Sequence, residues 1–228
     1  MPSWAIHLKV AKELAKDMPQ EEEQRFLLGN LLPDVNVGYL INPISKQIPY
    51  SITHYGKIET FDGKTREFPD YETFIKKYVD SMKDPIVRGY LAHLATDFYW
   101  NYQTYIKKGI YKNGKMIGLQ GKTNVVLGES EVLRQTKVGD FNSLSYHLYH
   151  NNLVEIPKFK EEFVQEAQKV SEIHIEKIDL EGVNQYFKEV PEKIQKENKA
   201  FKIFSLEEME QDLEENVEFI QNLFKKIE

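Results

Sequence analysis

The chain of 228 residues contains no cysteine. This absence removes disulfide bonds and thiolate metal ligands together, and it leaves the cellular compartment open. No window reaches the roughly 18 apolar residues that a membrane span requires. The amino-terminal stretch "MPSWAIHLKVAKELAKDM" carries charges throughout and lacks the apolar centre and cleavage site of a secretory signal. We therefore expect a cytoplasmic protein.

An excess of basic charge is also absent. The chain has 30 lysine and arginine residues against 36 aspartate and glutamate residues, a net charge of -6. We find no dense basic tract with interleaved aromatic residues, so polymeric nucleic acid is not an expected partner. The 41% of hydrophobic and 12% of aromatic residues are ample for a sizeable core. We expect one globular domain over residues 1–228.

Helical periodicity dominates the chain. Residues 3–18 and 20–32 predict two helices, the second ending at Pro33, and residues 34–56 are expected to form a loop. Asp84 and Pro85 are typical of the N-cap and first position of a long helix. A last helix begins with a capping box from Ser205 to Glu208. Further helices are expected at residues 70–82, 123–137, 140–152, 157–174 and 179–197.

Two short segments predict β-hairpins instead. "TFDGKTREF" turns at an Asp-Gly pair, and "GIYKNGKMIGL" turns at Asn113 and Gly114. Both hairpins are short compared with the helices around them. The expected fold is therefore all-α, a single multi-helix domain with small β-hairpin excursions.

The stretch "GYLAHLATDFYWN", residues 89–101, places His93 and Asp97 one turn apart in a helix that is apolar on two faces. Burying an ionised Asp97 without a partner would cost several kcal/mol, and Arg88 points elsewhere. A histidine and an aspartate at i and i+4 can bind one metal ion together. The alternative is a buried His93 hydrogen-bonded to Asp97 without metal.

Three other residues could join such a site. Asp34 follows Pro33 and could point back toward the core, although an N-cap or Asx turn would also explain it. His54 lies in a loop between apolar neighbours, where the alternative is a surface or lid histidine. His7 lies on the inner side of the first helix, where the alternative is a core histidine with a hydrogen-bond partner.

The order of four motifs carries more information than any one of them. "PSWAIH", "LLPD", "THY" and "HLATD" occur in this sequence in the order that resembles the zinc-dependent phospholipase C superfamily. That superfamily includes the fungal single-strand-specific nucleases and the catalytic domain of a glycosylphosphatidylinositol-specific phospholipase D. The resemblance is nearest to the intracellular bacterial branch of phospholipase C-like hydrolases, and it extends over residues 1–101.

The resemblance implies ligands for two zinc ions. In the family one zinc is held by residues that fall here on Asp34, His54, His93 and Asp97. The last aspartate also bridges to a second zinc, which is completed by His7 and by the amino group and carbonyl of the mature amino terminus. One bridging carboxylate can hold two ions about 3.5 to 4 Å apart. With Met1 present, we do not expect a terminal-amine ligand, and we expect Trp4 to be a packing residue.

The sequence departs from the family in its remaining metal ligands. Asn101 stands where a further histidine follows the HxxxD pattern, and the second half contains no HxxxE. One or two zinc ions are therefore expected rather than three, and other divalent metals are possible. His147 and His150 could form a separate site with Asp140 or Glu155, but polar residues at a pocket mouth are the favoured interpretation.

The resemblance implies a phosphoester hydrolase that is similar to phospholipase C. Zinc would activate a water molecule, and Asp34 or Asp97 would orient that water or accept its proton. The expected substrate is a small phosphoester or a phospholipid. A non-catalytic helical metal-binding domain with a degenerate site is the alternative. A phosphohydrolase of the HD type ranks lower, because the sequence contains no His-Asp dipeptide.

Overall fold

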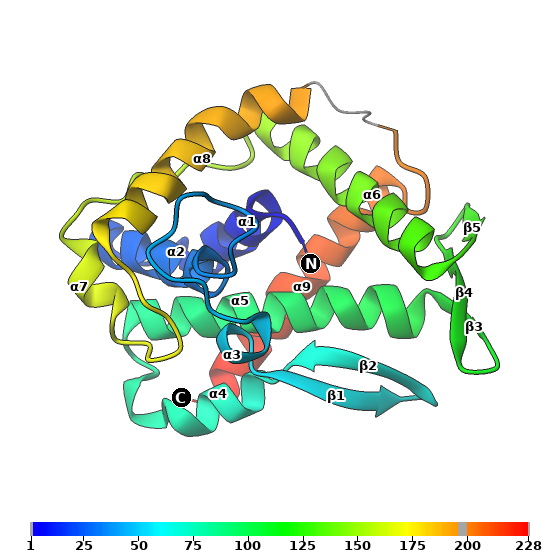
Figure 1. The fold of residues 1–228 in the computed structure, drawn as a ribbon, viewed down its shortest axis with the longest axis horizontal. Coiled ribbons are helices and arrows are strands. Elements are labelled where there is room, and N and C mark those ends of the chain that lie inside the picture. The colour runs from blue at the N-terminus through cyan, green and yellow to red at the C-terminus, as the bar shows by residue number, and fades with distance from the viewer. Residues whose placement is uncertain (1, 196–199, 228) are drawn as a thin grey trace.

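The computed structural model describes residues 2–195 and 200–227. A long central helix, α5, crosses the molecule, and α2 and α9 pack against it (Figure 1). Helix α1 contacts α2, α5, α6 and α9, so it lies between the central helix and the outer helices. The helices are α1 (Trp4–Ala15), α2 (Gln20–Val35), α3 (Tyr50–Thr53), α4 (Tyr71–Lys77), α5 (Pro85–Asn101), α6 (Ser130–His150), α7 (Phe163–Ala167), α8 (Lys177–Gln195) and α9 (Leu206–Ile227).

Two glycines allow α2 and α5 to approach closely. A Cβ atom at Gly29 would lie 2.1 Å from the carbonyl oxygen of Ile86, and one at Gly89 would lie 2.1 Å from that of Phe26. No larger side chain fits at either position without moving a backbone. This contact fixes the last turn of α2 beside the middle of α5, where the candidate site lies.

Helix α2 continues through Pro33, so the predicted helix end at this residue is wrong. Proline lacks the N–H that would bond to the carbonyl four residues earlier, which normally disfavours it inside a helix. Here residues 31–35 are all buried, and their packing holds the last turn in place. Asp34 therefore projects from a helix rather than from a loop.

Several predicted boundaries are confirmed. Asp84 accepts a hydrogen bond from the backbone N–H of Ile86 at 2.9 Å, with Pro85 at the first helical position. Ser205 and Glu208 exchange two hydrogen bonds of 3.1 Å, as a capping box requires.

Other predicted helices differ from the structure. The two predicted over residues 123–137 and 140–152 are one helix, α6, which is preceded by a strand. The helix predicted over residues 157–174 is reduced to α7 with five residues. The end of the helix predicted over residues 179–197 lies outside the described residues.

The strands form two antiparallel sheets. β1 (Gly56–Phe61) pairs with β2 (Lys64–Pro69), and β4 (Lys115–Gln120) pairs with both β3 (Gly109–Lys112) and β5 (Val125–Leu127). The two predicted hairpin turns are confirmed, because Asp62, Gly63, Asn113 and Gly114 all have φ between 50° and 73°. A short π-helix over residues 102–107 connects α5 to the second sheet.

The all-α prediction is wrong. Five strands in two sheets make a mixed α/β structure that is mostly helical. The unpredicted strand is β5, whose β-branched Val125 and Val126 suit an extended backbone, and Gly128 separates it from α6. The helices of the described chain do not include one that is long and apolar enough to cross a membrane.

Candidate metal site

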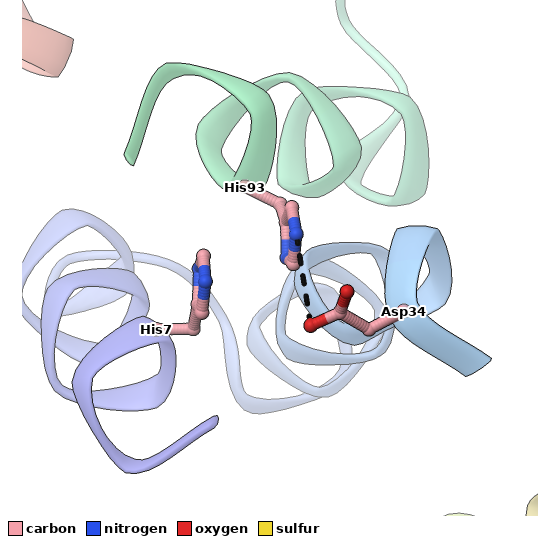
Figure 2. Close-up of side chains that lie close together, drawn as sticks. All are labelled: His7, Asp34 and His93. Atoms are coloured by element: carbon pink, nitrogen blue, oxygen red, sulfur yellow. Dashed lines mark ion pairs between the residues drawn. The ribbon is translucent and has the colours of Figure 1, made fainter. Parts of the chain in front are cut away.

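Five residues from four helical segments converge in the interior of the molecule. His7 comes from α1, Asp34 from the last turn of α2, His54 from the end of α3, and His93 and Asp97 from α5. Figure 2 shows three of these side chains pointing toward one another from separate helices. All five are 0 to 1% exposed. The structure thus brings together every residue that the sequence predicted as a metal ligand, and it buries His54, which the sequence left open as a surface histidine.

The contacts within this cluster join imidazole nitrogens to carboxylate oxygens. Nε2 of His54 lies 3.4 Å from Oδ1 of Asp34 and 3.5 Å from Oδ2 of Asp97. Nε2 of His93 lies 3.9 Å from Oδ2 of each carboxylate, and Nε2 of His7 lies 3.3 Å from Oδ1 of Asp97. The rings of His7 and His93 stack with centroids 3.9 Å apart. One small volume is therefore bounded by three imidazoles and two carboxylates.

The outer nitrogens of two histidines are held by neighbouring groups. Nδ1 of His93 lies 2.6 Å from the carbonyl oxygen of Asn30, which can only accept, so this nitrogen carries the proton. Nδ1 of His54 lies 2.8 Å from Oγ1 of Thr53, which in turn donates to the carbonyl of Tyr50. Both contacts orient the rings so that Nε2 faces the centre of the cluster. Metal-binding histidines are typically held in this way.

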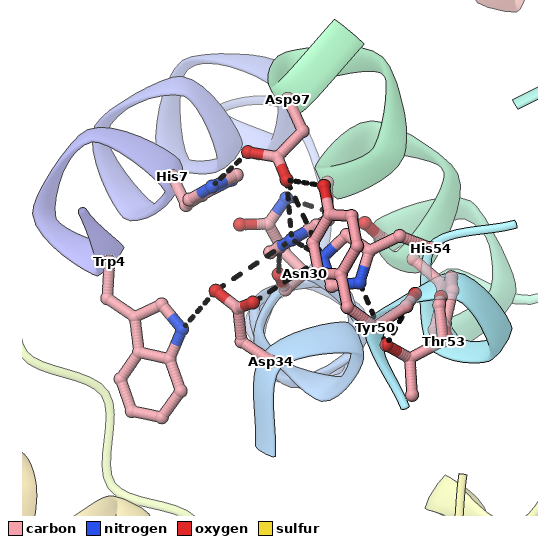
Figure 3. A network of polar contacts seen from close by, with 11 residues as sticks. Trp4, His7, Asn30, Asp34, Tyr50, Thr53, His54 and Asp97 are labelled. Carbon is pink, nitrogen blue, oxygen red and sulfur yellow. Dashed lines mark hydrogen bonds and ion pairs between the residues drawn. The ribbon is translucent and has the colours of Figure 1, made fainter. Parts of the chain in front are cut away.

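The two carboxylates are also held by side chains outside the cluster (Figure 3). Nε1 of Trp4 donates to Oδ2 of Asp34 at 3.1 Å, and the hydroxyl of Tyr50 donates to Oδ2 of Asp97 at 3.2 Å. The Tyr50 ring stacks on His54 with centroids 3.8 Å apart. Sequence analysis treated Trp4 only as a packing residue and did not identify Tyr50. For Trp4 the available signal was its spacing, because Trp4 lies one helical turn before His7.

Burial and mutual charge set the protonation of the cluster. Burial, together with the nearby His7, lowers the pKa of His93 to about 3. Burial alone would raise the pKa of Asp97, but the hydrogen-bonding approach of His7 and the proximity of the other two imidazoles lower it. Burial likewise opposes ionisation of Asp34, and the proximity of His93 and His54 lowers its pKa. The cluster thus favours ionised carboxylates and a neutral His93, the forms that bind metal.

Two features of the cluster fit a metal ion. Several of its buried polar atoms lack hydrogen-bond partners in the described structure, and its donors are imidazole nitrogens and carboxylate oxygens. Oδ1 of Asp34, Oδ1 of Asp97 and both ring nitrogens of His7 are buried and lack hydrogen-bond geometry to any described residue. In the described part of the chain, no lysine or arginine forms an ion pair with either carboxylate. Ligand atoms within 4.8 Å of one another define two overlapping groups that share His93. They are His7, Asp34 and His93, and His54, His93 and Asp97.

The second candidate set from the sequence does not assemble into such a group of described residues. Nε2 of His147 lies 3.2 Å from Oε1 of Glu210, and His150 stacks on a neighbouring tyrosine. Asp140 accepts hydrogen bonds from the backbone N–H groups of residues 202–204, so it holds a loop in place. The terminal-amine ligand concerns Met1, which lies outside the described residues.

The structure therefore contains a buried histidine and aspartate cluster that could hold a metal ion. The identity of the metal and the division of the ligands between two ions stay predictions. Comparisons of the chain with protein-family models, with curated proteins and with solved structures give no match.

Proposed function

We propose that this protein is a zinc-dependent phosphoester hydrolase that resembles phospholipase C. One observation carries the proposal: three imidazoles and two carboxylates face the same buried volume, and several of their atoms lack other partners. A buried carboxylate whose charge is not balanced by a cation costs several kcal/mol. A divalent cation is the partner that would offset this cost for both carboxylates at once.

The donor set supports zinc among the divalent metals. Zinc prefers imidazole nitrogen and carboxylate oxygen when thiolates are absent, whereas calcium and magnesium prefer oxygen ligands alone. A zinc ion held by these residues would polarise a phosphoryl oxygen and lower the pKa of a coordinated water. Asp34, His54, His93 and Asp97 would hold one ion, and His7 with Asp97 would hold a second.

The two carboxylates have the geometry expected of residues that also act as a general base. Each has one oxygen fixed by an outer donor, Trp4 for Asp34 and Tyr50 for Asp97. The other oxygen of each lacks a hydrogen-bond donor among the described residues. That second oxygen can orient a water molecule or accept its proton. We assign these roles to Asp34 and Asp97.

One observation favours the alternative, a non-catalytic metal-binding domain. A catalytic zinc keeps a coordination position that is open to water, whereas a structural zinc is closed. All five cluster residues are 0 to 1% exposed, and Tyr50 covers His54 and Asp97. In the hydrolase, we expect Tyr50 to move before substrate reaches the cluster.

The test is elemental analysis of protein purified without an affinity tag or chelator. We expect one to two equivalents of zinc in the unmodified protein and in His147→Ala, and a loss of zinc in His93→Ala and Asp97→Asn. Zinc-loaded protein is then assayed with phosphomonoesters, phosphodiesters and phospholipids. Absence of metal in the unmodified protein would contradict both functions. Bound metal without hydrolysis of any substrate would favour the non-catalytic alternative.

A further inference from the structure

A pocket of about 300 Å³ lies next to the metal cluster. We call it the Arg66 pocket, and its lining residues are Tyr50, Arg66, Glu67, Asn101 and Tyr105. Tyr50 belongs to both features, because its ring stacks on His54 and its hydroxyl bonds to Asp97. The pocket and the cluster therefore share the Tyr50 side chain.

Arg66 brings a positive charge to this pocket without a carboxylate partner. Its guanidinium lies 4.6 Å from the centre of the Tyr105 ring, and Nη2 lies 3.5 Å from the sulfur of Met116. The residue opposite Arg66 on β1 is Glu59, which is paired with Lys57 at 2.7 Å. Among the described residues, no carboxylate lies within ion-pair distance of Arg66. Its remaining guanidinium donors are thus available to a ligand.

A second cation lies behind the same tyrosine. Lys137 is 2% exposed, and its Nζ donates a hydrogen bond to the hydroxyl of Tyr105 at 2.7 Å. This amine, too, has no ion-pair partner in the described part of the chain. Arg66 and Lys137 therefore make the Tyr105 wall of the pocket electropositive, although the whole chain is acidic.

The side-chain amide of Asn101 adds neutral hydrogen-bond donors to the pocket. Asn101 lies one turn after Asp97 on α5 and is 8% exposed. Its side-chain amide makes no hydrogen bond to a described residue. The amide lines the pocket together with the guanidinium of Arg66, where a ligand can reach both groups. An amide nitrogen and a guanidinium together suit the oxygens of an anion.

We propose that the Arg66 pocket binds an oxyanion, a phosphate or carboxylate group, that belongs to the substrate. Glu67 is the one carboxylate that lines the pocket, and it is exposed, so water screens its charge. That the bound anion belongs to a substrate of the hydrolase rests on the proposed function. The binding of an anion in the pocket does not rest on it. The preferred substrate carries a second anionic group near the scissile phosphoester, and a trimethylammonium headgroup is disfavoured by the guanidinium.

The binding test uses inorganic phosphate and chelator-treated protein, so that metal cannot contribute. Titration calorimetry at low salt compares the unmodified protein with Arg66→Gln and Asn101→Leu, and with Arg134→Gln as a matched control. Arg134 is exposed and paired with Glu131. We expect the two pocket variants to bind phosphate about tenfold more weakly, and the control to be unchanged. No binding by the unmodified protein, or equal affinity in Arg66→Gln and Arg134→Gln, overturns the proposal.

A second experiment tests the anion site and the proposed hydrolase activity separately. Zinc-loaded protein is given two phosphodiesters that differ only in the headgroup, one with a second phosphate and one with a trimethylammonium group. Arg66→Gln is expected to lower kcat/KM about tenfold for the first diester and, because it removes a repulsive charge, to raise kcat/KM for the second. Equal losses for both overturn the assigned role in specificity. If neither diester is hydrolysed while phosphate binding still depends on Arg66, the hydrolase fails and the anion site stands.

Discussion

Nε2 of His54 and Nε2 of His93 lie 3.1 Å apart in the centre of the cluster. His93 carries its proton on Nδ1, which faces the carbonyl of Asn30. Oγ1 of Thr53 donates to the carbonyl of Tyr50 and therefore accepts a hydrogen bond from Nδ1 of His54. Two nitrogen lone pairs then face each other, which is unfavourable without a proton or a cation between them. A metal ion bound between these nitrogens would remove this conflict and would balance the charge of both carboxylates.

The hydrogen bond from Trp4 to Asp34 makes zinc binding visible by fluorescence. The chain has two tryptophans, and the indole of Trp4 donates directly to a cluster carboxylate. We expect zinc to change the tryptophan emission of the unmodified protein and of Trp100→Phe, but not that of Trp4→Phe. Because the indole donor also orients Asp34, Trp4→Phe should weaken zinc binding about tenfold. An unchanged zinc response in Trp4→Phe would contradict this role.

Tyr50 stacks on His54 and donates to Asp97, so we expect it to control access to the cluster. Tyr50→Phe removes the hydroxyl that donates to Asp97 and keeps the ring that covers His54, whereas Tyr50→Ala removes both. We expect a strong chelator to extract zinc about threefold faster from Tyr50→Phe and at least about tenfold faster from Tyr50→Ala. Stopped-flow measurement with a coloured chelator gives these rates. Equal rates in Tyr50→Ala and the unmodified protein would show that metal leaves by another route.

The close contact of α2 and α5 depends on Gly89. A methyl group at this position would meet the carbonyl oxygen of Phe26 at 2.1 Å. Gly89→Ala should therefore lower the free energy of unfolding by about 3 kcal/mol and displace Asp34 from the cluster. The matched control is Gly139→Ala in α6, where no atom lies within 4 Å of the added methyl. Helix propensity predicts a gain of about 0.5 to 1 kcal/mol there, and urea unfolding measures both.

Glu172 gives the fold a component of stability that depends on pH. It accepts hydrogen bonds from Tyr55, from Lys77 and, at 2.6 Å, from Tyr78. Burial alone would raise the pKa of Glu172, but the bonds from Lys77 and the two tyrosines outweigh it and lower the pKa. Since the folded pKa is lower than the unfolded one, this stability is present at neutral pH. It is lost as the pH falls below about 4.3, the ordinary pKa of a glutamate.

Glu172→Gln tests this pH dependence. The variant should be less stable than the unmodified protein by about 2 kcal/mol at pH 7, and the difference should shrink as the pH falls below about 4.3. Urea unfolding across this pH range measures it. Glu162→Gln serves as the control, because Glu162 is exposed and its contact with Lys160 is expected to contribute little. A difference that stays constant with pH would contradict the assignment.

Local features of the sequence were sufficient for part of this structure. The Asp-Gly and Asn-Gly turns, the N-cap at Asp84 and the capping box at Ser205 each depend on a few neighbouring residues, and all are confirmed. The full length of α6, which has 21 residues, and the strand β5 were missed, because tertiary packing overrides local propensity there.

The candidate site, like the fold, could be predicted only in part from the sequence. The sequence by itself determined that His93 and Asp97 share one helix face and that, without cysteine, a metal here must be held by nitrogen and oxygen. The ordered motifs also indicated His7, Asp34 and His54 as partners. Only the tertiary structure decided that these groups meet, that α2 continues through Pro33 and that Trp4 and Tyr50 support the carboxylates. These contacts join residues distant in sequence, and they depend on the close packing of α2 against α5, which local spacing does not encode.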